Sequence, residues 1–148
     1  MGFFPAGTYD LFLTHAWRYT DEWQGLVALL DAHLPGRWRN WSLPWYDTSI
    51  ERLSTEGHAE LERLLHGQIS MASAIVLVPE TIGTTEGQTW LDIQLAIAGR
   101  YAKPIIGVRP RDGQPFPKEL AERVDCVVGR DAGDIIQALG VLQIRRAS

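Results

Sequence analysis

The chain has 148 residues, of which 45% are hydrophobic and 22% are charged, as in an ordinary globular protein of one domain. Its 14 basic and 18 acidic residues give a formal net charge of −4, which argues against broad binding to nucleic-acid phosphates. Its single cysteine, Cys126, excludes an internal disulfide, and no apolar stretch is long enough to cross a bilayer. We therefore expect one cytoplasmic domain over residues 1–148, with Cys126 in its core and with neither nucleic acid nor membrane as a partner.

The first part of the chain alternates strand and helix patterns. An apolar run rich in β-formers predicts a first strand over residues 9–14. A capping signal at Thr20 and Asp21 and apolar residues at helical spacing then predict a helix that ends before Pro35. A second strand is expected over residues 38–42.

The middle of the chain continues this alternation. Residues 43–54 are expected to be irregular, and leucines at helical spacing predict a second helix over residues 61–72. Residues 74–78 form the clearest strand pattern of the chain. A loop rich in Gly and Thr is expected over residues 80–88, followed by a third helix over residues 90–101.

The last part of the chain, from residue 104 onward, shows the patterns of two further strands and two helices. The strands are expected over residues 104–108 and 125–129, with a polar loop and a short helix over residues 117–123 between them. Apolar residues at helical spacing mark a final helix over residues 135–142.

Five strands that alternate with helices favour an α/β fold with a parallel sheet covered on both faces. At this length we expect a three-layer, flavodoxin-like sandwich with strand order 2-1-3-4-5. Ligands of such sheets bind beyond the carboxyl ends of the strands, where the strand order reverses. The predicted site therefore lies over strands 1 and 3, between the loops of residues 14–20 and 79–89, with residues 43–54 nearby.

Aromatic residues gather on these loops and their borders: Trp17, Tyr19, Trp45, Tyr46 and Trp90. They suit a pocket for a planar ring, although for any single one of them core filling is the favoured alternative.

Polar residues near the same loops also have two interpretations each. His15 suits contact with a phosphate or ribose, or a helix cap. Asp47 suits ribose hydroxyls, although a turn is favoured, and Arg109 and Arg111 suit phosphates, although a solvated loop is favoured.

Several other chemistries lack their motifs. The sequence has no phosphate-binding Gly-x-x-x-x-Gly-Lys, no dinucleotide Gly-x-Gly-x-x-Gly after the first strand and no Gly-x-Ser-x-Gly elbow. The histidines His15, His33, His58 and His66 are scattered without zinc spacing, so no metal is expected, and His58 and His66 are expected at the surface.

Five segments resemble, in order, the TIR-like proteins of bacterial antiphage defence, a family that includes the NAD-processing proteins of Thoeris systems. The likeness runs from about residue 9 to residue 140. The segments are residues 9–17 (Tyr-Asp-Leu-Phe-Leu-Thr-His-Ala-Trp), 40–44 (Asn-Trp-Ser-Leu-Pro), 74–79, 90–98 (beginning Trp-Leu-Asp-Ile-Gln) and 103–110 (Lys-Pro-Ile-Ile-Gly-Val-Arg-Pro).

The resemblance implies a protein that takes NAD as its substrate without a metal. Such enzymes break the bond between nicotinamide and ribose and leave ADP-ribose, a cyclised isomer or a conjugate, which signals to a partner effector. It also implies a homo-oligomer. The residues expected to bind NAD are His15, Ala16, Trp17, Trp45, Asp47 and Trp90.

The chain departs from the family at the position expected to be catalytic. The family's glutamate lies four residues after the tryptophan, and that position is Gln94. Glutamine keeps the shape but not the charge, and loss of a preorganised charge slows a reaction roughly a hundredfold or more.

Four interpretations of Gln94 stay open. The favoured one is a substrate-trapping Glu-to-Gln form, and the others are a naturally inactive binding protein and an enzyme that uses another carboxylate. The candidates for that carboxylate are Glu80, Glu86 and Asp92. Gln94 could also simply face solvent on its helix.

Two other functions compete with NAD cleavage. One is a non-enzymatic TIR scaffold that acts by assembly with other TIR domains. The other is a nucleoside deoxyribosyltransferase, which uses a similar fold and a nucleophilic glutamate.

Overall fold

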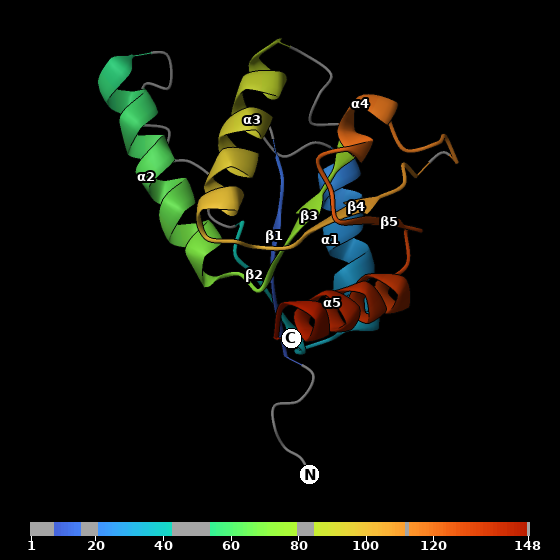
Figure 1. Ribbon diagram of the computed structural model, residues 1–148. Helices are drawn as coiled ribbons and strands as arrows, with labels where there is room; N and C mark the ends of the chain where they lie inside the picture. Colours follow the sequence, from blue (N-terminus) through green and yellow to red (C-terminus); the bar gives the residue numbers. More distant parts are fainter. Residues whose placement is uncertain (1–7, 16–20, 43–53, 80–84, 112, 148) are drawn as a thin grey trace.

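The computed structural model describes residues 8–15, 21–42, 54–79, 85–111 and 113–147, and Figure 1 shows their arrangement. The strands are β1 (Tyr9–Leu13), β2 (Trp38–Asn40), β3 (Ala74–Leu77), β4 (Ile105–Val108) and β5 (Cys126–Val128). The helices are α1 (Asp21–His33), α2 (Thr55–Met71), α3 (Thr85–Arg100), α4 (Lys118–Ala121) and α5 (Ala132–Ala147).

The strands form one five-stranded sheet in the order β2-β1-β3-β4-β5, and every pair in it is parallel. Both the predicted order and the predicted α/β, flavodoxin-like class are confirmed. β1 lies inside the sheet, where Leu11 is paired with Asn40 on one side and with Ala74 on the other. Because all strands run the same way, their carboxyl ends lie at one edge.

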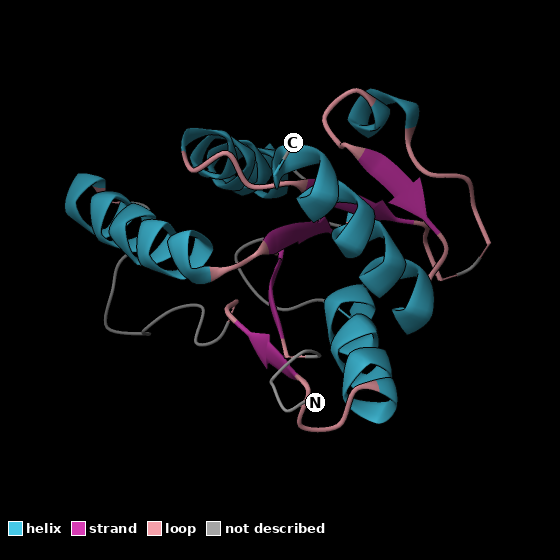
Figure 2. Ribbon diagram, turned by 60° about the horizontal axis from the view of Figure 1, so that its bottom comes forward, coloured by secondary structure: helices cyan, strands magenta, loops and turns pink. Residues whose placement is uncertain are grey.

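Helices cover both faces of the sheet (Figure 2). Side chains alternate along β1, so Leu11 and Leu13 pack with leucines and isoleucines of α1 and α5. Phe12 points to the opposite face and packs with α2 and α3. All three are 0% exposed, which explains why β1 has a continuous apolar run rather than an alternating pattern.

The face of β4 depends on a residue without a side chain. A Cβ atom built on Gly107 would lie 2.6 Å from Cζ of Phe116. The ring of Phe116 therefore packs directly on β4, beside a buried cluster that includes Leu120 of the single-turn helix α4. Glycine at position 107 therefore lets Phe116 and the single-turn helix α4 cover this face of β4.

Several element bounds differ from the sequence prediction. The largest difference is at α2, which begins at Thr55 rather than at residue 61, because the Ser54 side chain caps it by accepting from the Gly57 N–H. α3 begins at Thr85, inside the segment expected to be a loop, because Thr and Gly are weak helix formers that hid its first turn. β2 ends at Asn40, where the Asn40 side chain accepts a hydrogen bond from the backbone N–H of Ser42 at 3.0 Å and begins a turn. α5 begins earlier than expected, at Ala132, where Asp131 accepts a hydrogen bond from the Asp134 N–H.

Among the helices built from described residues, none combines the length and the apolar character needed to span a bilayer.

We predict opposite effects for two glycine-to-alanine changes. Gly107→Ala forces the Cβ atom against Phe116 and should lower the free energy of unfolding by about 1–3 kcal/mol. Gly67→Ala, in the interior of α2 with no atom within 4 Å of the new Cβ, should raise it by about 0.5–1 kcal/mol. Urea unfolding of both variants measures the difference, and equal effects would contradict this account of Gly107.

Candidate functional site

Three buried polar residues lie at the carboxyl edge, where β1 and β3 meet α3. Thr14 and Gln94 are 0% exposed and His15 is 1% exposed. We call these three residues the β1-exit cluster. Because buried polar groups are costly unless hydrogen-bonded, their partners determine what the cluster does.

The side-chain amide of Gln94 bonds to both backbone polar groups of His15. Its Oε1 accepts from the His15 N–H at 3.0 Å, and its Nε2 donates to the His15 carbonyl at 2.6 Å. Nε2 also donates to the carbonyl of Trp90, one helical turn earlier, at 2.9 Å. Gln94 therefore faces the interior, and the solvent-facing alternative is wrong.

Thr14 continues the pairing of β1 and β3 past the last residue of each strand. Its N–H donates to the Val76 carbonyl at 2.9 Å, and its hydroxyl accepts from the Val78 N–H at 2.8 Å. The ends of β1 and β3 are thus held together by side chains as well as by the sheet ladder.

The ring of Trp90 packs between α2 and α3. The residue is 2% exposed, and its ring stacks on that of His58 with centroids 4.9 Å apart and an interplanar angle of 26°. His58 also lies 3.5 Å from the carboxylate of Glu62, and its side chain is 39% exposed, so it lies at the surface as expected while one face of its ring packs on Trp90. In this arrangement Trp90 packs the core, and its role in NAD binding stays a prediction.

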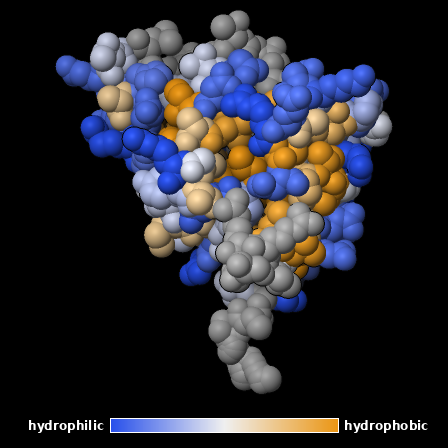
Figure 3. Space-filling view, viewed as in Figure 1, coloured by the Kyte–Doolittle hydropathy of each residue, from blue (hydrophilic) through white to orange (hydrophobic). Residues whose placement is uncertain are grey.

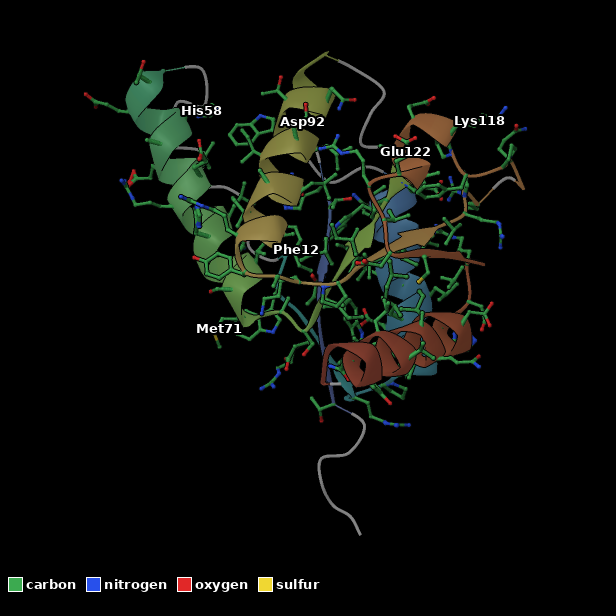
Figure 4. The ribbon with its side chains drawn as sticks, in the orientation of Figure 1. Phe12, His58, Met71, Asp92, Lys118 and Glu122 are labelled. Carbon is green, nitrogen blue, oxygen red and sulfur yellow. The ribbon has the colours of Figure 1, made fainter. Side chains whose placement is uncertain are left out.

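Asp92 projects from a different side of α3 (Figure 4). Its carboxylate lies 2.6 Å from Arg123 Nη1 and accepts from Gln88 Nε2 at 2.9 Å. The structure does not bring Asp92 to the β1-exit cluster, so it is a poor replacement for a carboxylate at position 94.

Other predicted site residues lie outside the described residues. These are Ala16, Trp17, Trp45 and Asp47, together with the alternative carboxylate Glu80. Glu86 belongs to the first turn of α3.

The carboxylate of Asp10 ties β1 to β2. It accepts from Arg39 Nε at 2.5 Å and from the indole N–H of Trp41 at 2.9 Å. Partial burial by itself raises the pKa of Asp10, but the hydrogen bonds from Arg39 and Trp41 and the charge of Arg39 outweigh it, so the pKa lies below its ordinary value. This contact fixes β2, whose end carries Asn40 and the buried Ser42.

A buried ion pair, missed from the sequence, lies at the same edge beyond β4 and β5. Glu22 Oε1 lies 2.7 Å from Arg130 Nη1, and the two side chains are 8% and 14% exposed. The same oxygen accepts from the backbone N–H of Arg111 at 3.0 Å. Glycine at position 25 makes room for this pair, because a Cβ there would lie 2.9 Å from Arg130 Nη2.

One sequence signal could have revealed Glu22. It precedes Leu26 and Leu30 at intervals of four, so it lies on the buried face of α1. The prediction of a solvated loop holds for the exposed side chains of Arg109 and Arg111, although the backbone and guanidinium of Arg111 both approach Glu22.

An apolar groove of about 420 Å³ runs along β5 and α5. Its lining includes Cys126, Val128, Ala138 and Val141, and Val141 is 44% exposed. Cys126 is only half-buried, so its expected place in the core is partly wrong. Figure 3 shows hydrophobic residues at the surface around β5.

Within the described residues, no three His, Cys, Asp or Glu side chains are grouped so that they could hold a metal ion.

No protein-family model matches the chain, and no curated protein matches it. A similar solved structure is the CMP N-glycosidase BcmB of Clostridium botulinum, with 12% identity and a TM-score of 0.43 over 90% of this chain and 98% of that one. At this level of similarity the likeness supports no conclusion about substrate or reaction.

We predict that the Glu22–Arg130 pair is a strong structural tie. Arg130→Met leaves a buried carboxylate without its nearest cation and should lower the free energy of unfolding by about 3 kcal/mol. The double variant Glu22→Gln/Arg130→Met should lose less than the sum of the single changes. Arg63→Met is the control: it breaks an exposed pair with Glu60 and should change the free energy of unfolding little. Urea unfolding measures all variants, and a double variant that loses the full sum of the two single losses would contradict the pairing.

Proposed function

We propose that this chain is a TIR-like domain that binds NAD at the carboxyl edge of β1 and β3 and acts in antiphage defence in the cytoplasm. One observation carries the proposal. The hydrogen bonds between Gln94 and His15 join residues 79 positions apart, and these residues belong to two of the segments that resemble TIR-like proteins. The resemblance implies that both segments border the NAD site, and their direct contact supports that assignment.

The expected reaction is cleavage of the bond between nicotinamide and ribose. Nicotinamide leaves as a neutral molecule, and positive charge develops on the ribose, which a nearby carboxylate stabilises. Gln94 supplies no charge, and its amide already bonds the backbone. Asp92 and Glu22 are paired with Arg123 and Arg130.

We therefore propose that NAD is bound by this chain and cleaved slowly. Formation of ADP-ribose, or of a cyclic or conjugated product that signals to an effector, would be roughly a hundredfold or more slower than in an enzyme with a preorganised carboxylate beside the ribose.

A non-enzymatic scaffold is the second candidate, and the groove along β5 and α5 favours it. β5 is at the end of the strand order, and Val141 exposes an apolar side chain beside it. Edge strands and apolar patches are common sites of assembly, which fits the homo-oligomer that the resemblance implies.

We predict measurable NAD binding with slow release of nicotinamide. Calorimetry should give a dissociation constant below about 1 mM, and chromatography should show release far slower than about one per second. Transfer of deoxyribose between deoxynucleosides and free bases is the control reaction and should not occur. Absence of binding up to millimolar NAD would contradict the proposal. Rapid release of nicotinamide would instead move the catalytic role to Glu80 or Glu86, and the variants Glu80→Gln and Glu86→Gln would show which of the two carries it.

We predict that self-association depends on the groove. Val141→Glu adds a charge to the apolar lining and should shift the chain from oligomer to monomer in light scattering, with the thermal midpoint nearly unchanged. Met71→Glu is the matched control, because Met71 is 56% exposed at the end of α2, away from the groove (Figure 4). A chain that is monomeric throughout, or a Val141 variant that assembles normally, would exclude this interface.

A further inference from the structure

We infer that Gln94 is a positioning residue whose amide fixes the path of the chain as it leaves β1, and that position 94 is closed to an ionised carboxylate. The inference stands on hydrogen bonding and burial and does not require that NAD is the ligand. It assigns a reason for glutamine at a position where the resemblance leads one to expect glutamate.

The amide matches its surroundings atom by atom. Nε2 carries two N–H groups, and the two carbonyls that it faces are those of His15 and Trp90. Oε1 faces the single N–H of His15. The primary amide of Gln94 thus supplies the two donors and the one acceptor that its three backbone partners require.

The contact replaces a strand partner. His15 lies two residues beyond the end of β1. Its backbone N–H and carbonyl both bond to the side chain of Gln94, as they would bond to a neighbouring strand inside a sheet. α3, which carries Gln94, is itself held by Trp90, Ile97 and Ala98 in the core. The position of the His15 backbone is therefore set by α3.

An ionised glutamate would not fit this arrangement. It has no proton to donate, so an oxygen would replace Nε2 against two carbonyl oxygens, at the present distances of 2.6 and 2.9 Å. The site is 0% exposed, so bulk water cannot relieve the repulsion. Burial and the two carbonyls would raise the pKa of such a glutamate, and only its protonated form could donate one of the missing bonds.

Stability against pH tests the inference. For a glutamate at this position, the folded-state pKa exceeds the unfolded value of about 4.3. Stability is then lost as the pH rises from the unfolded to the folded pKa. We expect Gln94→Glu to lower the thermal midpoint by about 10 °C relative to the parent chain at pH 8, and at least half of this deficit to disappear at pH 5.

Two variants separate the amide from the volume and from the added charge. Gln94→Met has similar length without hydrogen bonds and should show a deficit that does not vary with pH. Gln143→Glu adds the same charge at an exposed position of α5 that does not line the groove and should behave like the parent chain at every pH. A Gln94→Glu deficit that is absent, or that is independent of pH, would overturn the inference.

A measurement on the unaltered chain decides the matter even if Gln94→Glu does not fold. In ¹⁵N-resolved hydrogen exchange, the side-chain N–H protons of Gln94 should exchange about a hundredfold or more slowly than those of the exposed Gln143. The reason is that the two N–H groups of Gln94 donate to the carbonyls of His15 and Trp90 inside the protein. Equal exchange at the two side chains would sink the inference. Neither experiment contains NAD, so failure of this inference and failure of the proposed function are distinguishable.

Discussion

Parallel pairing of the strands is the constraint on which the rest of this molecule depends. It requires a crossover between successive strands and places every carboxyl end at one edge of the sheet. Two buried polar groups form at that edge: the β1-exit cluster between β1, β3 and α3, and the Glu22–Arg130 pair beyond β4 and β5. Each joins segments that only this topology brings together. Both groups therefore lie at the edge where ligands of open α/β sheets bind.

The fold class could be predicted from the sequence because strand and helix patterns are local, and the strand order was predicted from the order usual for parallel sheets of this length. The apolar runs of β1 and β3 are typical of strands buried on both faces, and the helix faces follow from their apolar spacing. Element bounds were less predictable where one side chain decides them. Asn40 ends β2 by accepting a backbone hydrogen bond. The first turn of α3 contains Thr85 and Gly87, whose weak helix propensity gives no sign of it.

The topology predicts a candidate site over strands 1 and 3, and the resemblance to TIR-like proteins singled out Gln94, but neither gives the contacts that Gln94 makes. That the amide would bond to the backbone of His15 could not be predicted, because any residue type offers the same backbone groups and leaves no motif. Glu22 and its partner Arg130 are 108 positions apart in the sequence, and the stacking of His58 on Trp90 depends on how α2 meets α3. Such contacts depend on tertiary packing rather than on local sequence.

The long sequence interval between His15 and Gln94 has a kinetic consequence. Contacts between distant segments form only after the intervening chain has lost much of its freedom, which makes them slow and late. The intervening residues include β2, α2 and β3, so the exit of β1 is ordered only once most of the domain has assembled. A partly folded chain thus lacks the carboxyl-edge site. Any molecule that binds there selects the completed fold and, by mass action, draws the folding equilibrium toward it.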